Sequence, residues 1–139
     1  MADPPMADPR LPEPPLADPL LTDPVRANFS TCGYGERITC VVDGDTIWLE
    51  RIKIRIADIN TPETFKPDCP AEKALGDQAT VRLVQLLNQG PFDLRAVDRD
   101  EDRYGRKLRV ITRGGQSLGA ELVREGLAER WNGHRRNWC

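Results

Sequence analysis

Between residues 38 and 59 the chain consists of short runs of β-branched and apolar side chains, separated by brief polar interruptions. These runs predict three strands of a meander, at residues 38–42, 46–50 and 52–59. In the third run Ile52, Ile54 and Ile56 fall on one face, because alternate side chains of a strand point to the same side.

From Pro70 to Asn88 the spacing of apolar residues becomes helical. Proline is well suited to the first turn of a helix, and Gly90 lies just beyond the expected end. One apolar stripe is formed by Leu75, Ala79, Leu83 and Leu86 or Leu87. A second helix is expected over 118–128, with Ser117 as its N-cap.

Strand character returns twice between the two helices, at 91–97 and 107–112. The order of elements is therefore three strands, a helix, two strands and a helix. Five short strands with a helix after the third predict an α+β, mainly β fold: a five-stranded, partly open barrel of the OB type with two helices.

Most of the twelve prolines lie in the first 25 residues, where the tripeptide Ala-Asp-Pro recurs. Proline fixes φ and removes a backbone donor, so residues 1–30 are expected to form an extended, disordered arm. A rigid linker or a partner-binding tail is an alternative use of such an arm. The folded domain is expected to span 31–139.

Charge is distributed unevenly along the 139 residues. Residues 1–36 carry six acidic and two basic side chains, whereas 37–139 carry 16 acidic and 18 basic ones. Fourteen of those 18 are arginine, which forms bidentate contacts with phosphate. Ordinary surface charge explains this arginine content equally well. The composition alone therefore does not distinguish a phosphate-binding protein from any other.

Cysteine usage and targeting signals point to different compartments. No apolar run approaches the ~20 residues that span a bilayer, and no signal peptide is visible, which favours a cytoplasmic protein with no membrane partner. Four cysteines permit three disulfide pairings, and disulfides favour an oxidising compartment. Because Cys69 is flanked by prolines and Cys139 ends the sequence, we expect these two to pair, and Cys32 to pair with Cys40.

The first candidate for chemistry is Asp43-Gly44-Asp45, which interrupts an apolar run. Asp-Gly is a strong hairpin signal, so a simple turn explains it. Alternatively, the interruption delivers a carboxylate to a metal or phosphate site.

Two other polar stretches follow strand ends. Residues 59–64 place Asn60, Thr61 and Glu63 where an apolar strand stops. Residues 102–106 form a charged turn, Asp-Arg-Tyr-Gly-Arg, before the next strand. Taken singly, such residues are usually turn formers or solvated charges.

Together and in this order, the motifs VVDGDT, RIADINTPE, DRYGR and LVREGLA resemble the staphylococcal nuclease (thermonuclease) family over about 38–130. The resemblance implies an OB barrel and a calcium-dependent hydrolase of phosphodiester bonds in DNA, RNA or both. A single-stranded nucleic acid substrate and a monomeric protein are expected. A catalytically inactive OB-fold module that binds nucleic acid or protein is the alternative.

The resemblance also assigns residues to roles. Calcium ligands are expected from Asp45, from Asn60 and from the carbonyl of Thr61, with Asp43 nearby. Glu63 matches the family's general base. Arg55 and Arg106 match its two phosphate-binding arginines, which would stabilise the charge on the phosphoryl oxygens.

The sequence departs from the family pattern at two places. Asn60 stands where the family has an acid, so calcium affinity should be lower, although Asp58 can compensate electrostatically. The region after the second helix reads ERWNGHRRNWC in place of tyrosines and a long helix. There Trp131 or Trp138 can replace the stacking surface or pack on the barrel, and a Cys69–Cys139 bond can substitute for the missing helix.

Overall fold

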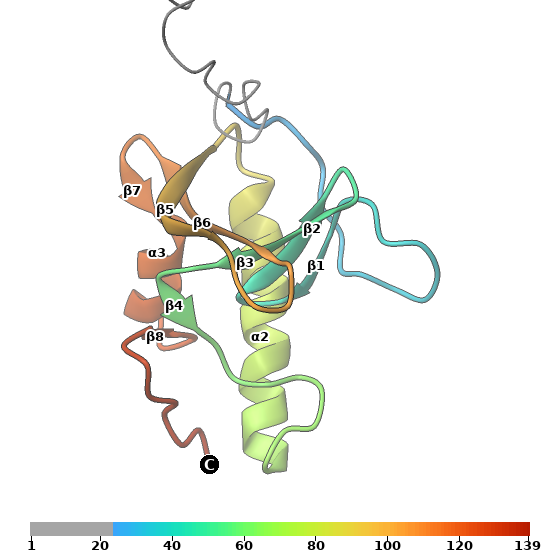
Figure 1. The fold of residues 1–139 in the computed structure, drawn as a ribbon. Coiled ribbons are helices and arrows are strands. Elements are labelled where there is room, and N and C mark those ends of the chain that lie inside the picture. Colours follow the sequence, from blue (N-terminus) through green and yellow to red (C-terminus); the bar gives the residue numbers. More distant parts are fainter. Residues whose placement is uncertain (1–23) are drawn as a thin grey trace, which may run out of the picture.

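The computed structural model describes residues 24–139, which form a main sheet, a small two-stranded sheet and two helices (Figure 1). The strands are β1 (Cys40–Asp43), β2 (Thr46–Leu49), β3 (Ile52–Ile56), β4 (Ile59–Asn60), β5 (Asp93–Glu101), β6 (Lys107–Arg113), β7 (Gln116–Ser117) and β8 (Glu129–Arg130), and the helices are α2 (Pro70–Leu87) and α3 (Leu118–Arg124).

The main sheet has the strand order β1-β2-β3-β6-β5, with β7 paired to β6. Strands β1, β2 and β3 form the antiparallel meander that the sequence predicts. β3 then pairs in parallel with β6, which places Arg55 opposite Leu108, two residues after Arg106. The five-stranded OB-type fold with two helices is thus confirmed.

Local sequence explains where the elements end. The predicted strand 52–59 is divided by a turn at Ala57 and Asp58, so that β4 pairs with β8 instead of continuing the main sheet. The second helix is shorter than predicted and stops at Arg124, because Gly126 adopts a φ of 80° and its amide turns back to the Val123 carbonyl. The Leu127 amide bonds the Leu122 carbonyl, which completes a Schellman end.

The core lies between the sheet and the helices. From the sheet it takes Ile47, Ile54 and Ile111, all fully buried. Helix α2 contributes Leu83 and Leu87 from the predicted stripe. Leu75, at the start of that stripe, is only partly buried.

The last residues of the expected arm 1–30 pack on the domain. Val25 forms a β-bridge with Phe92, and the side chain of Phe29 is 5% exposed within the core. The Asn88 side chain fixes Phe29 further by bonding both its amide and its carbonyl. The rest of the expected arm, residues 1–23, lies outside the described residues.

Two disulfides are present, Cys32–Cys40 and Cys69–Cys139, which are the expected pairings. The second bond joins the N-cap of α2 to the last residue, so the C-terminal tail runs beside α2 toward its N-terminal end (Figure 1). Neither helix within 24–139 has the length and apolar character needed to cross a bilayer.

Candidate active site

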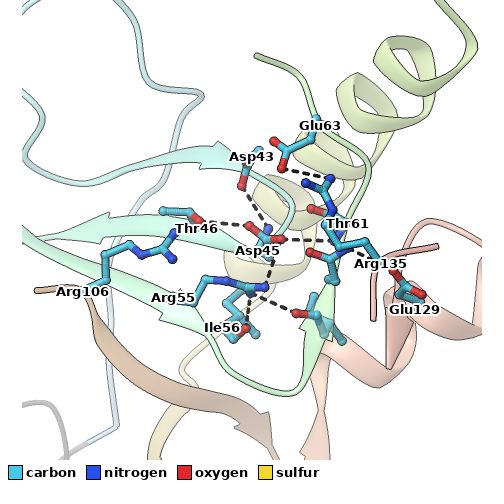
Figure 2. Close-up of polar contacts among 12 residues, drawn as sticks. Asp43, Asp45, Thr46, Arg55, Ile56, Thr61, Glu63, Arg106, Glu129 and Arg135 are labelled. Atoms are coloured by element: carbon cyan, nitrogen blue, oxygen red, sulfur yellow. Dashed lines mark hydrogen bonds and ion pairs between the residues drawn. The ribbon is translucent and has the colours of Figure 1, made fainter. Parts of the chain in front are cut away.

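A cleft of about 1060 Å³ is lined by residues of β1, β3, β5 and β6 and by the loops that follow β4 and precede β6. Five of the six predicted site residues line it: Asp45, Arg55, Asn60, Glu63 and Arg106. The sixth, Thr61, is buried and donates its backbone amide to Asp45. Figure 2 shows Asp45 at the centre of this group, between the arginines of the sheet and Glu63.

The Asp-Gly-Asp stretch is both a hairpin turn and part of the cleft. Asp43 pairs with Thr46 across the β1–β2 turn, which leaves Gly44 and Asp45 as the turn residues. Gly44 is required for packing here, since a Cβ would lie 2.7 Å from the Thr61 methyl group and 2.9 Å from the Ala79 Cβ. The turn is therefore pressed against α2 and against the residue after β4.

Asp45 is buried, with 8% of its surface exposed, and its carboxylate is held by three contacts. Its Oδ2 accepts a hydrogen bond of 3.1 Å from the Thr61 amide, and Oδ1 accepts one of 3.0 Å from the Thr46 hydroxyl. The Arg55 guanidinium lies 3.6 Å from Oδ2. These contacts fix the carboxylate in one orientation.

Asp43 adds a second carboxylate on the same turn, and its Oδ1 accepts the Asp45 amide at 3.3 Å. Burial, together with the neighbouring charge of Asp45, raises the pKa of Asp43 to about 8. A bound cation would relieve this repulsion between two carboxylates.

Asn60 is buried in β4, opposite Glu129 in β8. Its side-chain nitrogen donates a hydrogen bond of 3.0 Å to Glu129 Oε2, which orients the amide and leaves the carbonyl oxygen as the group available to a cation. Asp58, expected to compensate for Asn60, lies in the turn before β4 and accepts the Ser117 hydroxyl at 2.7 Å.

Arg55 projects from β3 into the cleft with its guanidinium anchored. Nη1 donates to the carbonyls of Ile56 and Ile59, and the guanidinium lies 6.0 Å from the centre of the Trp131 ring. These contacts hold the side chain in a single direction while Nη2 faces Asp45.

Arg106 is positioned by the turn that precedes β6. Asp102 accepts the Arg106 amide at 3.0 Å and its Nε at 2.6 Å. Burial would raise the pKa of Asp102, but the hydrogen bonds from the Arg106 and Tyr104 amides and from the guanidinium lower it. Gly105 has a φ of 81°, a left-handed conformation that favours glycine and lets the chain turn this sharply.

Glu63 lies in the loop after β4, and its carboxylate faces Arg135 from the C-terminal tail, 3.1 Å away (Figure 2). Burial raises the pKa of Glu63, and the positive charge of Arg135 opposes that rise. The Glu63 amide donates a hydrogen bond of 3.1 Å to Glu72, at the start of α2.

Arg135 and Glu72 are the residues that sequence reasoning missed. Glu72 could have been found, since an acid three residues after the N-cap Cys69 is the pattern of a capping box. Arg135 follows from the disulfide, because a bond between Cys69 and Cys139 brings the tail to the Glu63 loop. Of the two tail tryptophans, Trp138 is buried and Trp131 lines the cleft, 43% exposed.

The oxygen donors fit a hard cation. Within 24–139 no three His, Cys, Asp or Glu side chains are grouped so as to hold a metal ion. The cleft offers the carboxylates of Asp43 and Asp45 and the Asn60 amide, and the hydroxyl of neighbouring Thr61 is buried without a hydrogen-bond partner. Calcium prefers such a set of carboxylate and carbonyl oxygens.

Comparison with known proteins identifies relatives of this fold and site. A thermonuclease of Staphylococcus hyicus is 31% identical over 96 residues, covering 66% of this chain and 56% of that protein. Endonuclease YncB of Bacillus subtilis is 35% identical over 92 residues, covering 63% and 43%. A micrococcal nuclease of Shigella flexneri is 33% identical over 101 residues, covering 63% and 53%.

The chain thus spans about half the length of the curated relatives that it matches. The family model described as "Staphylococcal nuclease homologue" matches residues 53–137, which include the β3–β4 region, both helices and the Arg106 turn. With its OB-type sheet and a cleft lined by Asp45, Arg55, Glu63 and Arg106 among other residues, the chain belongs to the family of staphylococcal nuclease homologues.

Proposed function

We propose that this protein is a nuclease that hydrolyses phosphodiester bonds of DNA, RNA or both, with calcium as its cofactor. The observation that carries the proposal is the arrangement around Asp45. Arg55 and Arg106 come from the sheet on one side, and Glu63 comes from the loop on the other (Figure 2). A phosphate held between them has cationic groups on its oxygens and a carboxylate facing the phosphorus.

Glu63 is proposed as the general base. Its half-buried carboxylate can take a proton from a water molecule that attacks the phosphorus, and burial keeps its pKa above the ordinary value. Arg55 and Arg106 bind the non-bridging oxygens and stabilise the charge that grows on them in the transition state.

Asp45, Asn60 and the Thr61 carbonyl would hold the calcium ion, with the Asp43 carboxylate beside them. A bound divalent cation polarises the phosphoryl oxygen and neutralises charge. The cleft lining contains six acidic side chains and five arginines, so it has no excess of positive charge to attract a polyanion. A divalent cation would supply that positive charge.

Aromatic side chains in the cleft favour a single-stranded substrate. Tyr104 and Trp131 both line the cleft and are 67% and 43% exposed. Exposed rings stack on unpaired bases, whereas the bases of a duplex are already stacked on one another.

The test is a cleavage assay on purified protein with single-stranded DNA, duplex DNA and RNA, each with calcium and with excess chelator. We expect cleavage of the single strand that requires calcium and is restored when calcium is added back. Equal cleavage with and without chelator would refute the proposal that calcium is the cofactor.

An inactive binding module is the second candidate, and one observation favours it. Asn60 is a neutral amide at a position where the family pattern has an acid, and its side-chain nitrogen is bonded to Glu129. The site therefore has one acidic ligand fewer than the family pattern. Protein that binds oligonucleotides in a fluorescence-anisotropy titration yet leaves them intact at every calcium concentration would establish this alternative.

A further inference from the structure

The C-terminal tail, residues 131–139, has no helix or strand of its own, yet it is held against the domain at several points. Trp138 is 6% exposed, and Arg136 stacks on its ring at 4.5 Å. The Arg136 amide donates to Glu129, and Cys139 is bonded to Cys69. A segment without regular structure is fixed here by a few contacts and one covalent bond.

These contacts place the guanidinium of Arg135 in the active-site cleft. Arg135 Nη2 lies 3.1 Å from Glu63 Oε1 and 3.8 Å from Glu72 Oε2. The Arg135 side chain is 49% exposed, so it pairs with the carboxylates and still faces the cleft. Figure 2 shows it entering from the side opposite Arg55 and Arg106.

The other end of the disulfide acts on the same loop through Glu72. This carboxylate is 3% exposed and accepts the amides of Glu63 at 3.1 Å and Asp68 at 2.7 Å. The Glu72 amide in turn donates to the Cys69 sulfur, the N-cap of α2. Cys69 therefore supports the Glu63 backbone, while Cys139 holds the segment that contacts the Glu63 side chain.

We propose that Arg135 is a positioning residue for Glu63 and that the Cys69–Cys139 disulfide keeps it in place. This inference rests on the proposed nuclease function. Without Arg135, the carboxylate loses its charged partner and rotates among several orientations. Misplacement of a catalytic group by about 1 Å costs up to about 100-fold in rate, so a loss of about 10- to 100-fold in kcat is expected.

The first experiment compares Arg135→Gln, Arg135→Lys and Arg124→Gln with the unaltered protein in the cleavage assay. Arg135→Gln should lower kcat by about 10- to 100-fold and change KM by a smaller factor, because Glu63 acts on water and does not hold the phosphate. Arg135→Lys keeps the charge and should restore part of the loss. Arg124→Gln makes the same change in an exposed arginine of α3 that pairs with Glu121 and does not line the cleft, so it should leave kcat unchanged.

The second experiment tests the disulfide with Cys69→Ser/Cys139→Ser. Serine is a good N-cap, so this pair removes the covalent bond and preserves the helix start. We expect the same fall in kcat as for Arg135→Gln, and no further fall when the three substitutions are combined, because both act through one contact. Cys32→Ser/Cys40→Ser is the matched control and should keep its kcat, with the folded state of every variant verified by circular dichroism.

The outcomes separate this inference from the function on which it rests. Absence of cleavage by the unaltered protein refutes both. Cleavage with equal kcat in Arg135→Gln overturns the positioning role alone. If the fall in kcat of the combined variant equals the product of the two separate falls, the disulfide acts independently of Arg135. That result would refute the proposed role of the disulfide.

Discussion

The carboxylate of Asp45 accepts a hydrogen bond of 3.1 Å from the backbone amide of Thr61, sixteen residues later in the chain. This bond joins the β1–β2 turn to the end of β4. Gly44 makes the approach possible, because its hydrogen leaves room for the Thr61 methyl group and for Ala79 of α2. The two halves of the proposed calcium site are thus joined by packing as well as by a hydrogen bond.

Gly44→Ala should therefore disturb both stability and the site. The added methyl group has no space beside Thr61 and Ala79, and overpacking of this kind typically costs about 1–3 kcal/mol in the free energy of unfolding. Denaturant unfolding measures this loss. Gly33→Ala is the control, since a Cβ there meets nothing within 4 Å. Equal stability of the two variants would contradict the close packing.

Much of the fold could be predicted from the sequence because local patterns agree with the tertiary structure. Alternation over 38–56 placed the meander, and the stripe around Leu83 placed α2 against it. The parallel pairing of β3 with β6 could not be predicted in this way, since no local sequence pattern specifies it. It is nevertheless this pairing that sets Arg55 beside the turn of Arg106.

Residues of the site that depend on distant contacts could not be predicted. The bond between Asn60 and Glu129 arises because β8 pairs with β4, and a two-residue strand leaves no pattern in the sequence. Arg135 belongs to a tail with no periodicity, and its place beside Glu63 depends on the disulfide and on contacts of the tail with distant residues such as Glu129. Side chains fixed by long-range topology are the ones that sequence motifs miss.

Asn60→Asp should strengthen calcium binding, because it adds a charged ligand. Ligand charge tunes calcium affinity over several decades, and we expect dissociation constants of ~10⁻⁴–10⁻³ M for the unaltered site to fall by about 10-fold. Isothermal titration calorimetry measures the change. Unaltered affinity would mean that this side chain does not face the ion.

The Asn60–Glu129 hydrogen bond adds a second part to this test. In Asn60→Asp the donor is lost and two carboxylates face each other across β4 and β8. We expect lower stability without calcium, and recovery in Asn60→Asp/Glu129→Gln, where the glutamine amide supplies the missing donor. Thermal unfolding with and without calcium compares the two variants.

Glu72 should make the fold sensitive to acid. Hydrogen bonds from the Asp68 amide, foremost, and from the Glu63 amide lower the pKa of Glu72 below its ordinary value of 4.5. A carboxyl with a lowered folded-state pKa stabilises the protein above its unfolded pKa, and the contribution is lost as pH falls through the folded pKa.

Glu72→Gln should accordingly be less stable at pH 7, with a flatter loss of stability below pH 4.5, because the glutamine carries no titrating charge. Urea unfolding at several pH values measures this. Asp77→Asn removes an exposed carboxylate paired with Lys73 and serves as the control, with little effect expected. Parallel curves for Glu72→Gln and the unaltered protein would contradict the role of the buried carboxylate.

Glu63→Gln separates catalysis from binding. A general base acts on water in the transition state, so its removal should lower kcat by about 10²- to 10⁴-fold while KM changes little. Arg55→Ala and Arg106→Ala provide the contrast. Their guanidinium groups already meet the charged phosphate in the ground state, so both variants should weaken substrate binding as well as slow turnover.

The same kinetic measurements show whether a group other than Glu63 is the base. Cleavage by Glu63→Gln at the full rate would leave the fold and the activity in place and move the role of base to another group in the cleft.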